Sequence, residues 1–545
     1  MAGWGAVLVV ARADATPLLA NGKSLWAAVA LLVASVFASA QLGLPPSLAW
    51  PAAAMLVAAG ATALHAVSGS PRDGEQTTAF HTALLLAGVG SLLVAMIQVF
   101  VPSWADGNVI ARSGLPGRAV GNLRQPNHLS SLLLWALIAW VPLAQGGVVR
   151  GRRFARAAWL VVAALLVWAV VLTASRTGIV GVVLLALWGL VDRRLARWLR
   201  VALMCAPLAY LVFALGMSAW AHLSGHVFGG EERLAESDVS ASRWGIWANT
   251  LDMIRAQPWF GVGFGEFNFA WTLTPFPGRP VAFFDHTHDL PLQLLVELGV
   301  PLGSLVLLLL LWALVQAGAR AWQVEGEAGT GARAAFVMVL MIGVHSLFEY
   351  PLWYAYFLLP TAWAWGLALR RPAHTTSSLP RIAEPPRGDN GWMRAAGVLM
   401  VAGALFALYD YWKVVVIYAP SDNAGPLSER IERGQGSVFF AHHADYAAAT
   451  TTEPPSQAMA AFDSTTHSLL DTRLMLAWAR ALAESGHRDK ASYLAARLRE
   501  FHNPASADFF EVCNDPAQAG AEPKPFQCEP APTDIDWRDF RPRAE

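Results

Sequence analysis

Residues Phe284 to Gly299 read FDHTHDLPLQLLVELG. Two histidines, His286 and His288, stand just before an apolar helical run that leads into a membrane crossing. Histidine is the side chain best suited to moving protons near neutral pH. A histidine pair at the mouth of a membrane helix therefore predicts chemistry at a membrane surface.

The composition of the whole chain is that of an integral membrane protein. Of its 545 residues, 55% are hydrophobic and 14% charged, whereas a soluble domain carries about 25% charged residues. The 24 tryptophans fit indoles gathered at both membrane interfaces. The zero net charge gives no electrostatic basis for binding nucleic acid. No cleavable signal peptide is expected, because the first apolar run is long enough to span.

Apolar runs of about 20 residues predict membrane-spanning helices. The eleven predicted crossings are 24–43, 49–68, 79–101, 127–147, 157–175, 177–191, 201–220, 301–319, 334–352, 353–369 and 395–418. Two long runs are divided at polar turns, one at Arg176 and one at Glu349-Tyr350-Pro351, because a guanidinium at the bilayer centre is costly. The expected fold class is an all-α, polytopic membrane helical bundle.

Clusters of arginine set the expected orientation. They are Arg150, Arg152, Arg153 and Arg156, then Arg193, Arg194, Arg197 and Arg200, then Arg370 and Arg371. Counting crossings puts all three clusters on one side, which the positive-inside rule makes cytoplasmic. The N-terminus is then cytoplasmic, and the outer face receives loop 102–126, the Arg176 turn, the Glu349 turn and everything after residue 418.

The chain divides into a membrane core and an outer region. Residues 1–371 form the core, including the large outer loop 221–300. The Pro-, Ser- and Thr-rich segment 372–394 predicts a cytoplasmic linker, and 395–418 the last crossing. Residues 419–545 are expected to form an outer helical domain.

Apolar spacing in this outer domain, at 469–482 and again at 489–501, predicts a helix pair of tetratricopeptide-like form. One such pair is not stable alone, so further helices or docking onto the membrane part are expected. Cys513 and Cys528 could form a disulfide in an oxidising compartment. Cys205, inside an apolar run, is expected to be a packed core thiol.

Two outer-face arginines are candidates for holding an anion. A basic turn at Arg176 runs against the positive-inside bias and could bind an anion through bidentate contacts, unless its side chain only reaches to water. Arg243 follows Ser242, the expected helix N-cap, and would lie near a positive helix end unless it is merely solvated. An apolar stripe predicts that this helix lies along the membrane surface. The stripe is Trp244, Trp247, Leu251 and Ile254.

His288 is the favoured general base, and the residues do not decide between it and His286. The His-x-His pattern flanked by Asp285 and Asp289 also fits a metal site, but no further His or Cys cluster accompanies it in the loop, so no metal is expected. A purely structural histidine is the remaining alternative.

Other polar residues fall on the same outer face. Arg124, Gln125 and Asn127 stand where the fourth crossing begins, and Asn127 could simply cap that helix. His345 and Glu349 flank the later turn, which could be a turn alone. Random placement would scatter such residues over both faces, so their collection on one face indicates a supporting role in a site there.

Several motifs resemble those of the O-antigen ligase superfamily. They are Gly121–Asn127, Leu172–Gly178, the Arg243 helix followed by Gln257–Gly263, and His288–Gly299. His345–Tyr354 and the helical C-terminal region are more similar to the PglL branch, the bacterial protein O-oligosaccharyltransferases that include pilin glycosylation ligases. The resemblance covers most of the chain, with motifs in matching order and spacing.

The resemblance implies a multi-pass protein of the bacterial inner membrane that needs no cofactor and has a periplasmic C-terminal domain. Its donor would be an oligosaccharide on undecaprenyl diphosphate, and its acceptor a Ser or Thr hydroxyl of an exported protein such as pilin. Arg176, Arg243 and His288 match residues essential in the family, with the arginines on the donor diphosphate. The family often has Asn after this histidine; Asp289 replaces it here, so the chain departs from the family pattern at that position.

The expected reaction is a metal-independent displacement that inverts the anomeric centre. Ligation of O-antigen to lipid A–core and Wzy-like glycan polymerisation stay open, as do a glycan transporter and a non-catalytic assembly factor. A transporter needs polar residues along a path across the membrane, and their collection on one face argues against it. The C-terminal domain would either recruit the acceptor or brace the membrane part.

Overall fold

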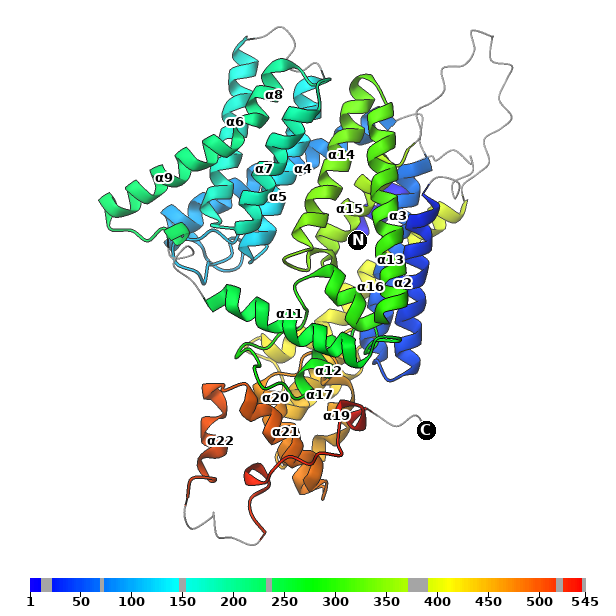
Figure 1. The fold of residues 1–545 in the computed structure, drawn as a ribbon, viewed down its shortest axis with the longest axis vertical. Coiled ribbons are helices and arrows are strands. Elements are labelled where there is room, and N and C mark those ends of the chain that lie inside the picture. Colours follow the sequence, from blue (N-terminus) through cyan, green and yellow to red (C-terminus); the bar gives the residue numbers. More distant parts are fainter. Residues whose placement is uncertain are drawn as a thin grey trace.

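The computed structural model describes residues 1–10, 22–68, 73–146, 153–231, 238–370, 391–515 and 523–541. Within these ranges the chain is helical and has no β-strand. Long helices form a bundle, and shorter C-terminal helices gather at one end of it (Figure 1). Most of the predicted linker 372–394 lies outside the described residues, as do Arg150, Arg152 and Arg371.

Nine helices of the described ranges are long and apolar enough to cross a membrane. They are α2 (Lys23–Gln41), α3 (Pro46–Ser68), α4 (Asp73–Phe100), α5 (Pro126–Gln145), α6 (Arg153–Leu172), α9 (Ala206–Ser224), α13 (Leu290–Gln323), α14 (Gly326–His345) and α16 (Gly391–Tyr418). The all-helical, multi-pass fold is thus confirmed. Two expected crossings, α7 (Arg176–Val191) and α15 (Ala355–Ala368), are shorter helices, so the count of eleven stays a prediction.

The two polar turns expected inside long apolar runs are both present. α6 ends at Leu172 and α7 begins at Arg176. α14 ends at His345, and a turn at Glu349 leads into the short 3-10 helix η3 (Pro351–Trp353) before α15. α5 and α14 lie at the centre of the bundle, since most of their residues are buried within the protein.

The run predicted as one crossing at 201–220 is instead two helices. The amphipathic α8 (Arg197–Met204) ends just before Cys205, and α9 begins just after it. Arg197 and Arg200 keep α8 near water, so the membrane helix starts only beyond them. Cys205 is exposed at this junction, and the prediction of a packed core thiol is wrong.

α13 contains a kink at Gly299, where φ is 77°. Segment 258–263 runs against the kink, and the Val262 N–H donates to the Val296 carbonyl oxygen at 2.9 Å. A Cβ on Gly299 would lie 2.4 Å from the Trp259 carbonyl oxygen. Only glycine fits this backbone and this close approach.

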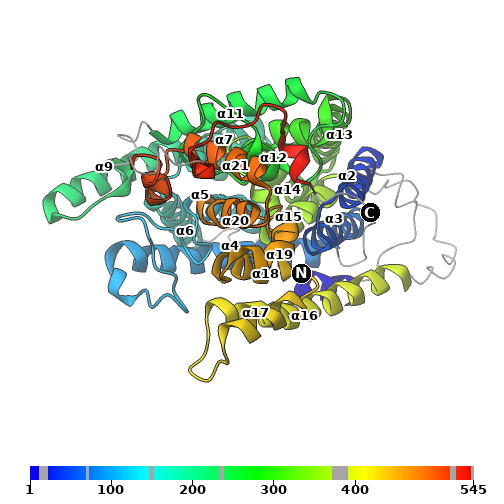
Figure 2. The same ribbon diagram turned by 90° about the horizontal axis from the view of Figure 1, so that it is seen from below.

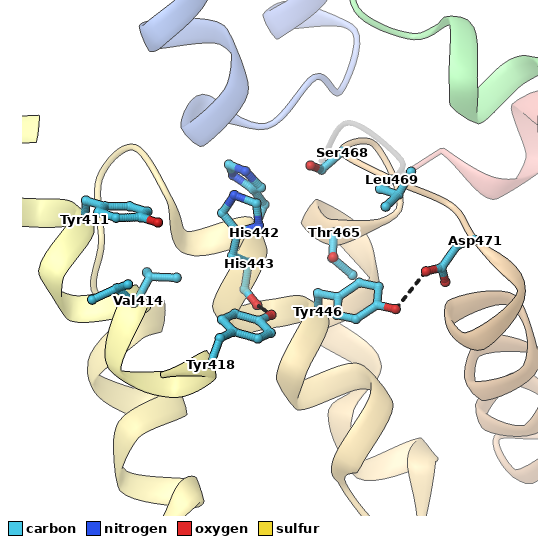
Figure 3. A pocket seen from close by; sticks show the side chains of 11 residues that line it. Tyr411, Val414, Tyr418, His442, His443, Tyr446, Thr465, Ser468, Leu469 and Asp471 are labelled. Atoms are coloured by element: carbon cyan, nitrogen blue, oxygen red, sulfur yellow. Dashed lines mark hydrogen bonds between the residues drawn. The ribbon is translucent and has the colours of Figure 1, made fainter. Parts of the chain in front are cut away.

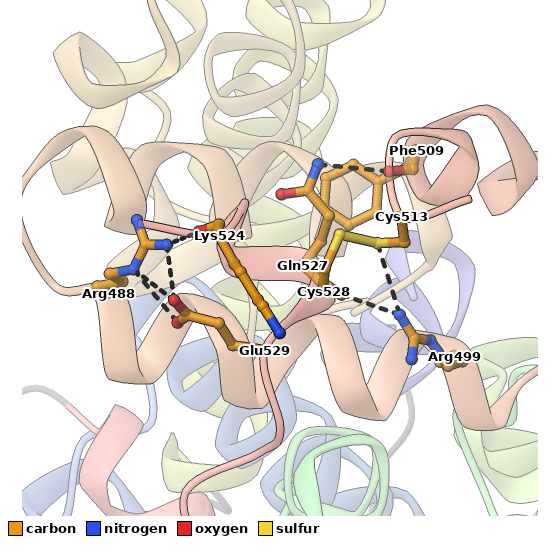
Figure 4. The surroundings of a disulfide bond; sticks show 8 residues. All are labelled: Arg488, Arg499, Phe509, Cys513, Lys524, Gln527, Cys528 and Glu529. Carbon is orange, nitrogen blue, oxygen red and sulfur yellow. Dashed lines mark hydrogen bonds and ion pairs between the residues drawn. A yellow bond between two sulfur atoms is a disulfide. The ribbon is translucent and has the colours of Figure 1, made fainter. Parts of the chain in front are cut away.

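The C-terminal region consists of short helices. They are α17 (Leu427–Gln435), α18 (Ala441–Thr451), α19 (Met459–Thr465), α20 (Thr472–Glu484), α21 (Arg488–Glu500) and α22 (Ala507–Glu511). α20 and α21 are the predicted helix pair, joined at Gly486, and Figure 2 shows them beneath the centre of the bundle. Cys513 and Cys528 form a disulfide beside α21 (Figure 4). A tetratricopeptide-like domain stays a prediction.

This region docks onto loop 221–300 through one shared hydrophobic core. α11 (Asp238–Ala256) and α12 (Phe267–Leu273) supply Ile246 and Trp271, and the C-terminal helices supply Trp478 and Phe501. Between α16, α18 and the segment that joins α19 to α20, a cavity of about 400 Å³ remains, and Tyr446 donates to Asp471 on its wall (Figure 3). Docking onto the membrane part, one of the two expectations, therefore takes place.

Replacing Gly299 with Ala should lower the stability of the protein by about 2–4 kcal/mol, because Ala is strained at this φ and its methyl group meets the Trp259 carbonyl. The thermal unfolding midpoint in detergent measures the effect. Gly216→Ala is the control, since nothing lies within 4 Å of a Cβ there. Equal midpoints for the two variants would contradict the role given to Gly299.

Candidate active site

A single buried carboxylate, Glu349, joins several distant segments at the end of the bundle next to the C-terminal helices. Its Oε1 accepts hydrogen bonds from Arg243 Nη2 at 2.6 Å and from Asn127 Nδ2 at 2.8 Å. Its Oε2 lies 2.8 Å from His288 Nδ1. The Glu349 side chain is only 6% exposed. These four residues are called the Glu349 network below.

Arg176 is connected to this network through its neighbour. Ser175 Oγ donates to Asn127 Oδ1 at 2.7 Å, and it accepts from the Gly178 N–H as the N-cap of α7. Arg176 follows as the first residue of α7 and is exposed. Arg176, Arg243 and His288 are therefore brought to one end of the bundle.

Three helices begin at this site with the same backbone arrangement. A non-glycine residue with positive φ precedes the N-cap of α5, α7 and α13: Arg124 (57°), Ala174 (50°) and His288 (54°). Each N-cap side chain accepts the N–H three residues further on. Such backbone strain costs about 1–3 kcal/mol and is found where function needs a fixed geometry.

The helix starts differ from two sequence predictions. Gln125 caps α5, not Asn127, so the Asn127 side chain is available to reach both Glu349 and Ser175. α11 begins at Asp238, not after Ser242, so Arg243 lies inside the helix, where its side chain contacts Glu349. A helix-end position for Arg243 is therefore wrong.

α11 runs across the end of the bundle (Figure 1). Trp244 and Leu251 of the predicted stripe are exposed there, as a helix on a membrane surface requires. Trp247 is instead half-buried, and its indole N–H donates to the Thr287 carbonyl oxygen at 2.9 Å. α11 thus holds the backbone just before His288 as well as carrying Arg243.

The two histidines of the loop have different partners. His286 stacks on Tyr350, with ring centroids 4.3 Å apart, and its Nδ1 lies 3.3 Å from Asp285 Oδ2. His288 alone contacts Glu349. The geometry therefore favours His288 where the sequence left the choice open.

Two further predicted supporting residues lie at the edge of the network. His345 is fully buried with its Nδ1 2.8 Å from Ser131 Oγ, and its carbonyl accepts the Glu349 N–H at 3.0 Å. Arg124 is exposed and donates to the Gly107 carbonyl of loop 102–126. His345 thus supports the turn that presents Glu349, whereas no contact joins Arg124 to the network among the described residues.

Two amides that the sequence did not single out hold the His288 loop. Gln293 Oε1 accepts the Thr287 N–H at 2.8 Å. Asn268 donates to the Phe284 carbonyl at 2.9 Å and accepts the Leu470 N–H at 2.8 Å, so it ties the loop to the C-terminal region. Gln293 lies one turn into the helix that follows His288, so its place in the sequence could have indicated a role near His288. Nothing in the sequence around Asn268 indicates such a role.

The network fixes the charge of Glu349 and the tautomer of His288. Burial alone would raise the pKa of Glu349, but the hydrogen bond and charge of His288, with the charge of Arg243, outweigh it and hold the pKa at about 2. A carboxylate can only accept hydrogen bonds, so His288 Nδ1 carries the proton. In the neutral form of the ring, with the proton on Nδ1, Nε2 is an acceptor.

The fold and the site define a multi-pass membrane protein with cationic groups and an oriented histidine at one end of its bundle. Three family models match the chain: "O-Antigen ligase" at residues 161–307, "Virulence factor membrane-bound polymerase, C-terminal" at 333–512, and "Protein glycosylation ligase" at 119–141. Together they contain every residue of the Glu349 network.

Two curated relatives come from Acinetobacter baylyi. A "General O-oligosaccharyltransferase" is 28% identical over 58% of this chain and 55% of its own length. A "ComP-specific O-oligosaccharyltransferase" is 25% identical over 47% of this chain and 44% of its own length. The matched part thus spans about half of each relative. By these matches the chain is similar to PglL-type proteins of the O-antigen ligase superfamily.

Glu349→Gln should lower stability by about 3 kcal/mol at pH 7, because the folded-state pKa of about 2 lies below the ordinary value of 4.5. A depressed carboxyl pKa stabilises the fold above the ordinary value, and this stabilisation is lost as the pH falls through the folded-state pKa. The gap between wild type and variant should therefore shrink as the pH falls from about 5 to about 2. Thermal unfolding at several pH values measures it, and a gap independent of pH would contradict the ionised, paired Glu349.

Proposed function

We propose that the protein transfers an oligosaccharide from undecaprenyl diphosphate to Ser or Thr hydroxyls of exported proteins, such as a pilin. The reaction takes place at the periplasmic face of the bacterial inner membrane. The observation that carries this proposal is Glu349, which holds His288 and Arg243 in one site connected to Arg176. The names of the family models and of both relatives support it.

The arginines act on the donor diphosphate. In the described part of the chain, Arg243 binds Glu349 through Nη2 alone, so Nε and Nη1 can donate to phosphate oxygens. Arg176 lies at the start of α7, where the N–H groups and the helix dipole favour an anion. Two guanidiniums would stabilise the charge that grows on the diphosphate as the glycosyl bond breaks.

His288 acts on the acceptor. The acceptor oxygen attacks the anomeric carbon, the bond from that carbon to the diphosphate oxygen breaks, and the diphosphate leaves with the bonding electrons. His288 Nε2 takes the hydroxyl proton, an effect typically worth 10²–10⁴-fold in rate. Glu349 orients the ring and stabilises the imidazolium that forms, as the carboxylate does in a Ser-His-Asp triad. One direct displacement inverts the anomeric centre and needs no metal.

The orientation follows from the charged ends of the bundle. α8 and its arginines lie at the end opposite to the C-terminal helices (Figure 1). The positive-inside rule makes the α8 end cytoplasmic, and the Glu349 network then faces the periplasm. The N-terminus is cytoplasmic and the C-terminal domain periplasmic, where the Cys513–Cys528 disulfide persists.

The C-terminal domain braces the His288 loop in this account. Asn268 joins Leu470 to Phe284, and Glu266 pairs with His467 at 2.7 Å with both side chains buried. Phe283 stacks on Phe501 with centroids 3.8 Å apart. The contacts surround the loop that presents His288, so bracing has more support than acceptor recruitment alone.

Co-expression with a lipid-linked glycan pathway tests the reaction and its acceptor. Intact mass spectrometry of candidate pilins and gel analysis of lipid A–core are run on the same cells. A glycan mass added to Ser or Thr of a protein supports the proposal. A glycan found only on lipid A–core, or only lengthened polymer, would assign the chain to the ligase or polymerase alternative.

His288→Ala should lower the transfer rate by at least about 100-fold, because no other group of the network takes the acceptor proton. His286→Phe keeps the stacking on Tyr350 and should retain most activity. Arg176→Lys and Arg243→Lys should each lower the rate by about 10-fold or more, since lysine lacks the planar fork. Transfer in purified membranes measures all four, and an inactive His286→Phe beside an active His288→Ala would reverse the two assignments.

A further inference from the structure

A basic, partly apolar pocket lies at the end of the bundle opposite the Glu349 network. It has a volume of about 540 Å³. α6 contributes Arg156 and Leu160, α8 contributes Arg197, Trp198, Val201 and Ala202, and Cys205 closes it at the start of α9. None of these residues takes part in the proposed transfer reaction.

The two arginines of the pocket differ from other arginines nearby. Arg194 donates to the Trp322 and Val324 carbonyls, and Arg200 donates to the Gly189 carbonyl at 3.0 Å. Arg333 is buried against Asp192 at 2.6 Å. Arg156 and Arg197 are exposed and make no hydrogen bond or ion pair within the described ranges. Their guanidinium N–H groups are therefore available to bind an anion from outside the chain.

The rest of the pocket is apolar and continues into the membrane-facing surface. Trp198 stands edge-on to Trp140, with centroids 5.7 Å apart, and forms a rigid wall. Exposed aliphatic side chains continue from the pocket along α6 and α9. They are Leu160 on α6 and Leu208 and Leu211 on α9. A free inorganic anion would use the two arginines but not this apolar surface.

We propose that this pocket binds an anionic glycerophospholipid, with the phosphate on Arg156 and Arg197 and the acyl chains along α6 and α9. Charge complementarity selects the anionic headgroup, and basic pockets between membrane helices are suited to lipids such as cardiolipin. The amphipathic α8 lies at headgroup depth, with Leu199 and Leu203 buried and Arg197 exposed. The bound lipid stabilises the junction between α6, α8 and α9.

Cys205 supplies a built-in reporter for the test. The chain has three cysteines, and the other two form the disulfide, so a maleimide labels Cys205 alone. Purified full-length protein in neutral detergent is labelled with increasing cardiolipin, phosphatidylcholine or inorganic phosphate. Cardiolipin should slow labelling at least fivefold, whereas phosphatidylcholine and phosphate should leave the rate unchanged.

Arg156→Gln with Arg197→Gln should raise the cardiolipin concentration needed for half-maximal protection roughly 30-fold, since each basic residue near an anionic lipid contributes about 1 kcal/mol. Arg193→Gln removes one positive charge from the turn just before α8, outside the pocket, and should keep wild-type protection. Without lipid, the rate of Cys205 labelling should be equal in the wild type and the variants, which checks that they fold alike. Native mass spectrometry of the wild type should retain cardiolipin in preference to phosphatidylcholine.

Three results would overturn the proposal. Equal protection by phosphatidylcholine would show unselective coverage, and protection by phosphate alone would assign the arginines to a free anion. Loss of protection in Arg193→Gln as large as in the pocket variant would show a general charge effect. Should the double variant not fold, a lack of cardiolipin preference in the wild type would still reject the site. None of these results depends on the proposed transferase activity.

Discussion

The site depends on one buried negative charge. A carboxylate removed from water must be paired and hydrogen-bonded, and Glu349 meets this requirement with Arg243, Asn127 and His288. Satisfying one side chain therefore brings together α5, α11, the loop before α13 and the turn after α14. The same contacts leave His288 Nε2 and two nitrogens of Arg243 available for other partners.

The chain enters three helices of the site with the same backbone conformation. Arg124, Ala174 and His288 each take a positive φ before a capping residue, which turns the chain sharply into α5, α7 and α13. The capping side chains accept hydrogen bonds from backbone N–H groups that would otherwise lack a partner at these helix starts. The positive ends of these helices then add to the field of the arginines, so that the region suits an anion such as a diphosphate.

Much of the fold could be predicted from the sequence, because hydropathy and the cost of a buried guanidinium are local properties. They gave the multi-pass helical bundle and the breaks at Arg176 and Glu349 correctly. The cap of α5, the start of α11 and the break at Cys205 were not predicted, since caps and amphipathic ends depend on tertiary contacts. For the same reason the bond between Asn127 and Glu349, 222 positions apart, could not be read from local pattern.

The central claim is that Glu349 acts through His288. The most direct measurement is a double-mutant cycle on the rate of glycan transfer, with Glu349→Gln and His288→Ala made singly and together in the same purified membranes. Residues that act as a unit are strongly non-additive. The account predicts that Glu349→Gln slows the wild type markedly but slows the His288→Ala protein several-fold less. Equal slowing in both backgrounds would contradict it.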